Sequence, residues 1–154
     1  MSEAKNNTEK EEIKITASGQ YIKDLSFENP QAPEIYTKKD LKPKISVSID
    51  INSKKLQEEL FEVELIINAS AECDNNKKMF LIELTYAGIF NIKNADDEDV
   101  LKEILFIYCP SLLFPYARRI ISDTTRDASM PPLMLDTINF RALYEAKKDT
   151  LKKM

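Results

Sequence analysis

Residues 108–121 read YCPSLLFPYARRII, and the rest of the chain is organised around them. Pro110 and Pro115 stand inside one of the most apolar segments, directly ahead of two arginines. Because proline lacks an amide donor and clashes with the preceding turn, this order predicts a helix that breaks at Cys109-Pro110. A second helix would restart near Leu112, with Pro115 in or near its first turn, where the missing N–H costs least.

The restarted helix carries apolar and small residues at a spacing of four, which is typical of a helix that packs one face against another layer. This predicted packing stripe comprises Tyr116, Ile120, Thr124 and Ala128, with Ala117 and Ile121 beside them. Such a stripe needs a surface to cover, and the sequence ahead of it predicts a sheet.

Four runs of alternating apolar and polar residues predict β-strands at 21–28, 45–51, 61–69 and 80–86. In the first run, Tyr21, Lys23, Leu25 and Phe27 share one face, and Ile22, Asp24, Ser26 and Glu28 share the other. Between the runs, the prolines of 30–43 predict an extended loop, and the Asp, Asn and Lys residues of 74–77 predict a hairpin turn. Gly88 is expected to loosen the chain after the fourth run.

Short polar turns between alternating strands indicate an antiparallel sheet with one buried face. The opposite face is expected to be exposed and acidic. It would carry Asp24, Glu28, Glu62, Glu64 and Glu83, together with the apolar Leu81.

After the strands, the apolar period becomes that of a helix, and the acidic run 96–99 suits its positive end. Pro131-Pro132 enforces a break, and a last helix is expected to begin near 137–139. The sequence therefore predicts an α+β protein, a four-stranded antiparallel sheet with helices packed on one face. The expected organisation is a disordered N-terminal tail at 1–12, one domain at 13–146 and a mobile C-terminal tail at 147–154.

The composition excludes several classes of function. A chain of 154 residues, 43% hydrophobic and 31% charged, fits one domain, and it has no histidine, the commonest general base and zinc ligand. Its net charge of −4 argues against a nucleic-acid partner. No run reaches the roughly 18 apolar residues that span a bilayer, and the N-terminus has no apolar signal core, so we expect a cytoplasmic protein without direct membrane insertion.

The patterns that could carry chemistry have simpler interpretations. The acidic run lacks calcium-loop spacing, and Gly88 belongs to no phosphate-binding loop. Cys109 has no histidine to activate it, and Glu62 and Glu64 fit a solvated strand face. Arg118 and Arg119 are predicted to form ion pairs in preference to binding phosphate. We therefore expect no catalytic residue, metal or cofactor.

The helical half carries more apolar residues than one face of a four-stranded sheet requires. Leaving such residues exposed favours association, because each fully buried Leu, Ile or Phe stabilises by roughly 1.5 to 3 kcal/mol. The surplus predicts an oligomer, a surface for apolar client segments, or both.

Several segments, in order, resemble the bacterial protein-export chaperone SecB family. They are KDLSFENP at 23–30, FEVELIINASA at 61–71, AGIF at 87–90, YCPSLLFPYARRIIS at 108–122 and LDTINFRALY at 135–144. The resemblance covers about residues 19–146, and its CPSLLFPYAR core is specific. It implies an ATP-independent chaperone that assembles as a homotetramer, a dimer of dimers, holds unfolded precursor proteins and delivers them to the export motor ATPase SecA.

The resemblance also implies two sets of contact residues. Positions that match the family's SecA contacts are Asp24, Glu28, Leu81 and Glu83. Client contacts are expected along apolar surfaces between the sheet and the helical elements, at Phe27, Tyr36, Leu112, Phe114, Leu133, Phe140, Leu143 and Tyr144. Two features depart from the family: the short tail ends in the basic DTLKKM, and Ala87-Gly88 replaces the common pair of glycines.

Two other functions fit the residues alone. One is a structural oligomerisation domain, which would not prefer unfolded ligands over folded ones. The other is a carrier of apolar ligands without chaperone activity.

Overall fold

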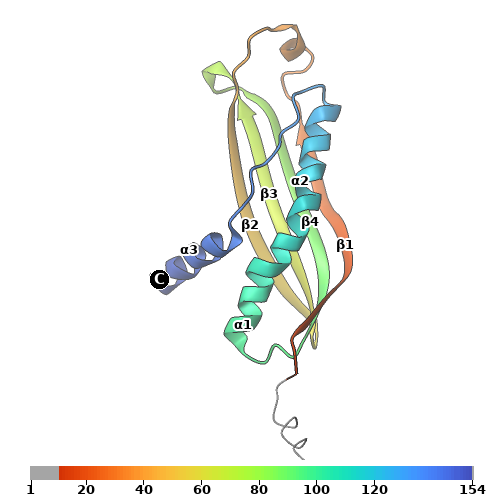
Figure 1. Cartoon of the computed structure of the whole chain (residues 1–154). Coiled ribbons are helices and arrows are strands. Elements are labelled where there is room, and N and C mark those ends of the chain that lie inside the picture. The colour runs from red at the N-terminus through yellow and green to blue at the C-terminus, as the bar shows by residue number, and fades with distance from the viewer. Residues whose placement is uncertain (1–10, 154) are drawn as a thin grey trace, which may run out of the picture.

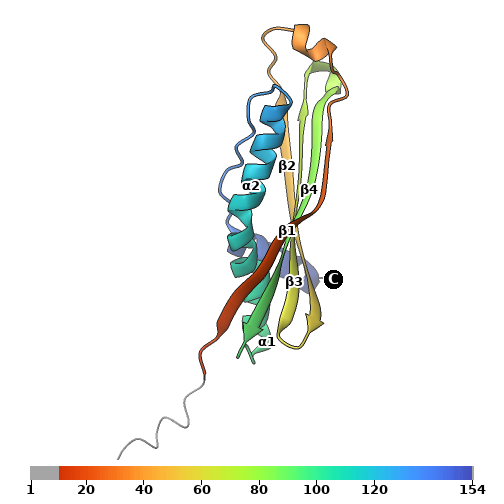
Figure 2. The ribbon, with the colours of Figure 1, turned by 90° about the vertical axis from the view of Figure 1, so that its right-hand side faces the viewer.

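The computed structural model describes residues 11–153, with the side chains of Asn75 and 150–153 left aside. Most of the predicted N-terminal tail, residues 1–10, therefore lies outside the described residues. The chain forms one twisted antiparallel sheet with a long helix across one face (Figures 1 and 2). This confirms the predicted α+β class and the four-stranded sheet.

The sheet has the strand order β1-β4-β3-β2, so β1 and β2 are its two edges. The strands are β1 (Lys14–Glu28), β2 (Lys44–Gln57), β3 (Leu60–Glu72) and β4 (Lys78–Lys93). All four predicted strands are present, and each is longer than its alternating run. The first half of β1 was missed because its small polar residues show no clear alternation.

One face of the sheet, here called the inner face, packs against the helices. Cross-strand pairing places Phe61, Leu65 and Ile67 of β3 opposite Phe90, Tyr86 and Leu84 of β4 on this face. Their neighbours in the chain point to the outer face, as the alternation predicts. The inner face supplies the largest fully buried side chains of the sheet: Val63, Leu65, Ile67, Ile82, Leu84 and Phe90.

A β-bulge corrects the alternation predicted for the first strand. Ile22 pairs with Tyr86 and Asp24 pairs with Thr85, so Lys23 is an extra residue in β1. Consequently Lys23 and Asp24 both lie on the outer face, whereas Ile22 lies on the inner face. Tyr21 and Lys23 therefore do not share a face with Leu25 and Phe27.

Gly88 lies within β4 and does not loosen it. A Cβ at this position would be 2.9 Å from Cε2 of Phe90 and 3.0 Å from Cδ2 of Leu113. The glycine therefore allows the helix to approach the inner face closely. Gly88 is therefore needed for a steric reason, and its neighbours in the sequence do not reveal the contact with Leu113.

The helix is continuous from Glu98 to Asp127, so the predicted break at Cys109-Pro110 is wrong. It comprises α1 (Glu98–Glu103), the π-helical turn η4 (Ile104–Tyr108) and α2 (Cys109–Asp127). In η4 the amide of Cys109 donates to the carbonyl of Ile104, five residues back, and this widened turn accommodates Pro110. Pro115 lies inside α2 and does not end it.

The buried face of α2 also differs from the predicted stripe. It is formed by Cys109, Pro110, Leu113, Phe114, Ala117, Ile121 and Thr125. Ala117 and Ile121 are buried as expected, but Tyr116 is 49% exposed. The phase of the buried face follows from the continuous helix, and it leaves Tyr116 on a flank.

Two connections complete the fold. The loop between β1 and β2 crosses the end of the sheet and contains a short 3-10 turn, η2 (Glu34–Thr37), which the prediction of an extended loop missed. After α2, residues 128–139, here called the strap, run back in the helix layer to α3 (Phe140–Lys153) (Figures 1 and 2). Asn139 accepts from the amide of Ala142 at the start of α3, close to the predicted start. The mobility of 147–154 stays a prediction, and α3 continues through Lys153.

By length and composition alone, the helix Glu98–Asp127 could cross a membrane. In the fold it lies along the inner face, where Leu113, Ala117 and Ile121 are fully buried. Packing on the sheet therefore accounts for the apolar character of this face.

Candidate functional site

The outer face carries part of the acidic surface predicted from the sequence. The prediction of a solvated strand face is wrong for Glu62, which is buried, and Glu64 is half-buried, because both bind Lys23. Asp24, Glu28 and Glu83 are exposed and Leu81 is half-buried. Glu28 pairs directly with Leu81, and Ser26 pairs with Glu83. The two strands therefore bring the four predicted SecA-contact residues onto one face. Within the part of the chain that the structure describes, the three carboxylates form no ion pair.

A second group on the outer face neutralises itself. Nζ of Lys23 lies 3.0 Å from a carboxylate oxygen of Glu62 and 2.7 Å from one of Glu64. The Tyr21 hydroxyl donates to the other oxygen of Glu62. We call Tyr21, Lys23, Glu62 and Glu64 the outer bridge, because they join β1 to β3 across Ala87 of β4.

The outer bridge perturbs its own ionisable groups. The hydrogen bond from Tyr21 is the main cause that lowers the pKa of Glu62. Burial, followed by the hydrogen bond to Glu62, raises the pKa of Tyr21 to about 12. Hydrogen bonds to Glu64 and Glu62 raise the pKa of Lys23. All three shifts keep the bridge in its paired form at neutral pH.

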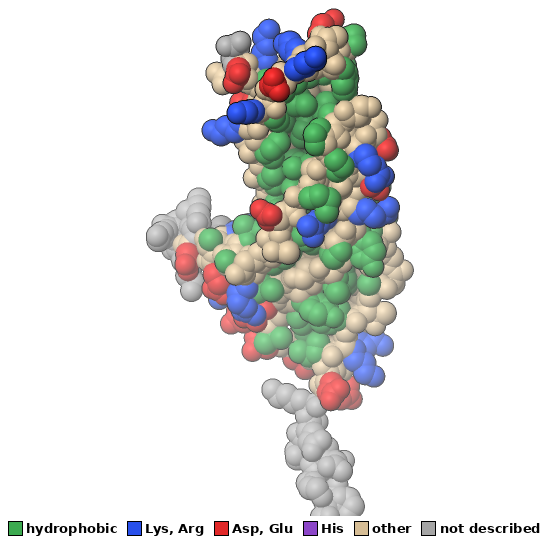
Figure 3. Space-filling model, turned by 45° about the horizontal axis from the view of Figure 1, so that its top comes forward, with side chains coloured by type: hydrophobic (Ala, Val, Ile, Leu, Met, Phe, Trp, Pro, Cys, Tyr) green, Lys and Arg blue, Asp and Glu red, His purple; other side chains and the backbone are tan. Residues whose placement is uncertain are grey.

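The inner face is not fully covered beside β2. Ile45 and Val47 of β2 are exposed there, and so are Tyr36 of the loop and Met134 of the strap. Figure 3, with the loop end turned toward the viewer, shows hydrophobic side chains gathered in a broad strip below the charged loop. We call these four residues the strap-side apolar surface, together with Leu133 of the strap and with Phe27 of β1, which lies on the inner face in the same cross-strand row as Val47.

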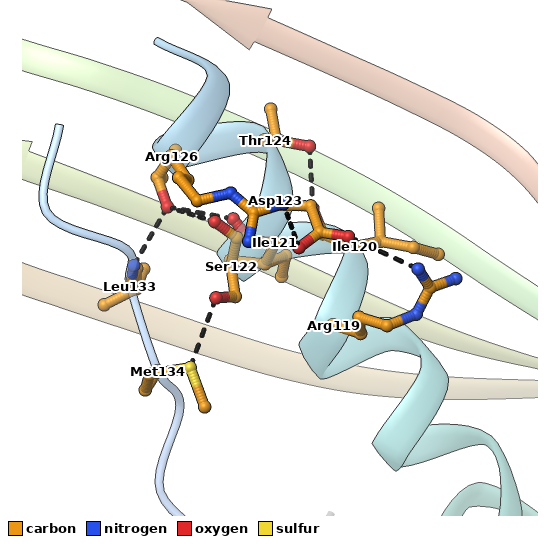
Figure 4. A network of polar contacts seen from close by, with 10 residues as sticks. Arg119, Ile120, Ile121, Ser122, Asp123, Thr124, Arg126, Leu133 and Met134 are labelled. Atoms are coloured by element: carbon orange, nitrogen blue, oxygen red, sulfur yellow. Dashed lines mark hydrogen bonds and ion pairs between the residues drawn. The ribbon is translucent and has the colours of Figure 1, made fainter. Parts of the chain in front are cut away.

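Hydrogen bonds hold the strap and the loop at the end of α2. The buried Thr125 hydroxyl donates to the carbonyls of Ile121 and Ser122 and accepts from the amide of Leu133, at 2.9 Å for the last bond. Ser122 and Met134 are also in contact (Figure 4). On the other side, the Tyr36 hydroxyl donates to the carbonyl of Ala128. The edges of the strap-side apolar surface are therefore fixed by polar contacts.

The eight predicted client-contact residues fall into three groups. Phe27, which stacks on Phe80 at 6.0 Å, belongs with Tyr36 and Leu133 to the strap-side apolar surface. A second group lies where α3 meets the long helix: Phe114, Phe140, Leu143 and Tyr144. Phe114 and Phe140 are buried against each other, and Tyr144 stacks on Phe106. Leu112 lies apart from both groups.

Leu112 belongs to an apolar flank of the helix on the side of β1. Tyr108, Leu112 and Tyr116 are exposed at a spacing of four, and Tyr116 stacks on Tyr86 of β4. Tyr86 pairs with Ile22 of β1, which is 48% exposed. We call Ile22, Leu25, Tyr108, Leu112 and Tyr116 the β1-side flank.

Sequence reasoning missed Ile45, Val47 and Met134 as surface residues. The two β2 residues alternate like core residues, and only the path of the strap shows that they stay uncovered. For Met134, the neighbouring Pro131-Pro132 was the available signal of an extended, exposed segment.

The other patterns have structural roles. Asp97 accepts from the amide of Asp99 at 2.9 Å, so the acidic run caps α1 as predicted. Cys109 is fully buried, and burial raises the pKa of its thiol to about 12, which suppresses the reactive thiolate. Arg119 pairs with Asp123 at 3.3 Å, as predicted (Figure 4). Arg118 forms no ion pair with the described residues, contrary to the prediction, and its Nε is buried without a hydrogen-bond partner among them.

These features define the class of protein. It is a small α+β binding protein that presents an apolar surface on one side of its sheet and an acidic surface on the other.

Comparison with known proteins identifies the family. The family model described as preprotein translocase subunit SecB matches residues 6–150. The chain is 47% identical over 148 residues to the protein-export protein SecB of Rickettsia akari, covering 96% of both chains. It is 48% identical over 128 residues to that of Parvibaculum lavamentivorans, covering 83% of this chain and 75% of the relative.

A solved structure shows the same fold at low identity. The SecB-like chaperone of Mycobacterium tuberculosis, in complex with a ChAD peptide from an antitoxin, superposes with a TM-score of 0.65 at 16% identity. The match covers 80% of this chain and 90% of that chain. The chain thus belongs to the SecB family: it is a cytoplasmic, non-enzymatic chaperone of protein export.

Proposed function

We propose that the chain is an ATP-independent holdase that binds unfolded precursors on its inner side and SecA on its outer face. The observation that carries the proposal is the pair of opposed surfaces on one sheet. Apolar side chains stay exposed beside the strap, and the exposed carboxylates of Asp24, Glu28 and Glu83 share the opposite face with Leu81.

The strap-side apolar surface suits an unfolded chain for a physical reason. Precursors expose apolar segments only before they fold, so an apolar surface selects the unfolded form. Phe27, Tyr36 and Leu133 are proposed as client contacts here, extended by Ile45, Val47 and Met134. Leu143 and Tyr144 would contact clients where α3 meets the helix, and Leu112 would do so on the β1-side flank. Phe114 and Phe140 are buried, so they would support this contact from beneath without touching the client.

The outer face suits a basic partner. Asp24, Glu28 and Glu83 can attract positive charge, and Leu81 offers an apolar contact among them. Because these carboxylates are exposed, their attraction is screened by salt. SecA binding should therefore weaken as ionic strength rises, whereas client binding should not.

Assembly as a dimer of dimers is supported by Ile22 and Leu25 of the β1-side flank and by the free edge of β1. An unpaired edge strand offers N–H and C=O groups to a second chain, and the exposed flank beside it offers apolar area. A tetramer would carry four times the charge of −4 of one chain, which keeps a loaded complex soluble.

Titration with a slow-folding precursor and with its mature folded form tests the proposal. The holdase should bind the unfolded precursor and leave the folded form free. Equal binding of both forms, or binding of neither, would support a purely structural oligomerisation domain instead. A tightly co-purifying apolar ligand would support a carrier.

A further inference from the structure

The outer bridge is a group of bonded side chains that belongs to neither of the two proposed binding surfaces. Glu62 is only 8% exposed although it carries a charge, and its two carboxylate oxygens are occupied by Tyr21 and Lys23. Glu62 and Glu64 therefore contribute no unpaired negative charge to the outer face, whereas the neighbouring Asp24, Glu28 and Glu83 are exposed. The bridge is anchored at Lys23, which is also the extra residue of the bulge in β1.

The bulge decides which side chains of β1 reach the outer face. In a regular strand, alternation from Ile22 would turn Asp24 toward the inner face and Leu25 toward the outer face. The extra residue reverses this, so Asp24 pairs with Thr85 and points outward. The same shift sets Glu28 opposite Leu81.

The contacts of Lys23 hold the bulge in place. Its ammonium reaches across β4 to Glu62 and Glu64 of β3, at 3.0 and 2.7 Å. The intervening side chain on this face is the small, fully buried Ala87, which leaves room for the crossing. Moving the bulge would leave the buried Glu62 without its cation, which is costly.

We propose that Lys23 is a positioning residue for SecA binding, because its ion pairs with Glu62 and Glu64 fix the bulge that turns Asp24 and Glu28 toward the outer face. The inference rests on the proposed assignment of the outer face to SecA. Lys23 itself need not touch SecA.

For Lys23→Gln, net charge alone and a positioning role predict changes of opposite sign in SecA affinity. Replacing Lys23 by Gln makes the outer face more negative, so a basic partner would be attracted more strongly. Positioning predicts weaker binding, because Asp24 and Glu28 lose their fixed orientation. The direction of the change therefore separates the two explanations.

The test compares Lys23→Gln, Lys23→Arg and Lys54→Gln in the full assembled chain, titrated with SecA and with an unfolded precursor. Lys54 of β2 lies opposite Glu62 of β3 in the register of the sheet, yet it forms no ion pair with any described residue. It therefore serves as the matched loss of one positive charge near the same carboxylate. We expect Lys23→Gln to weaken SecA binding by roughly threefold to tenfold, with client binding unchanged. Lys23→Arg should restore SecA binding, and Lys54→Gln should leave it equal or tighter.

SecA binding that is unchanged or tighter in Lys23→Gln would overturn the proposal. If Lys23→Gln does not fold, SecA binding by Tyr21→Phe tests the proposal instead. This substitution removes one hydrogen bond to Glu62 without changing the net charge of the outer face. Weaker SecA binding by about twofold in Tyr21→Phe supports positioning, and unchanged binding overturns it. Glu83→Lys in the same titration tests the face itself: SecA binding that survives Glu83→Lys overturns the proposed function, whatever Lys23 does.

Discussion

The two faces of the sheet have different roles, although neighbouring residues of the same strands form them. On the inner face, β3 buries Leu65 completely beneath the helix, and on the outer face the next residue, Ile66, stays half-exposed. The inner face stabilises the chain and continues into an uncovered apolar surface, whereas the outer face contributes charge. Stability and partner binding can therefore be changed separately.

The largest expected difference between the faces is in stability. Leu65→Ala should lower the free energy of unfolding by about 2 to 5 kcal/mol, because it leaves a cavity in the core. Ile66→Ala, one residue away on the outer face, should cost about 1 kcal/mol or less. Denaturant unfolding of both variants measures the difference. Equal losses would show that the outer face is also covered, as it would be in an unforeseen assembly.

Reversing a charge on the outer face should remove one partner alone. Glu83→Lys places a cation among Asp24 and Glu28, so SecA binding should fall by about tenfold or more while client binding stays constant. Glu58→Lys is the matched control, since it makes the same charge change in the β2–β3 turn. A loss of client binding in Glu83→Lys would contradict the assignment of the faces.

A charge on the strap-side apolar surface should have the reverse effect. Val47 is 44% exposed on the inner face, so Val47→Asp should fold but bind an unfolded precursor several-fold more weakly. The adjacent Ser48→Asp, on the outer face, should leave precursor binding unchanged. Fluorescence titration with a labelled unfolded precursor measures both. Equal precursor binding by Val47→Asp and the unmodified chain would place the client surface elsewhere.

The smallest expected effect concerns the pH dependence of the outer bridge. Tyr21→Phe should lower the free energy of unfolding at pH 7 by about 1 kcal/mol, since Glu62 loses a hydrogen bond. The pKa of Glu62 is lowered from 4.5, so this contribution is full above pH 4.5 and disappears as the pH falls through the lowered value. The pKa of Tyr21 is raised from 10.0 to about 12, so the contribution also fades as the pH rises across that range. A difference in unfolding free energy that does not shrink as the pH falls below 4.5 would contradict the bridge as its source.

The sequence predicted the parts of this molecule that depend on local pattern. Alternation in 45–51, 61–69 and 80–86 located three strands and placed Leu81 and Glu83 on the exposed face. The acidic run located the start of α1. These features hold because side-chain period and helix capping depend on neighbours in the chain.

The remaining features depend on partners distant in sequence. The bulge at Lys23 is held by Glu62 and Glu64, about forty residues away, so alternation alone misplaced Tyr21, Ile22 and Lys23. The widened turn at Ile104 to Tyr108 lets the helix continue through Pro110, although proline usually breaks a helix. The exposure of Ile45 and Val47 depends on the path of the strap.

The central claim is that the two faces bind different partners independently. Native mass measurement of the assembled chain with SecA and an unfolded precursor, without nucleotide, tests it most directly. Independent binding predicts a species that contains all three proteins, which loses only SecA in Glu83→Lys and only the precursor in Val47→Asp. Mutual exclusion of SecA and precursor, or loss of both partners in either variant, would contradict it.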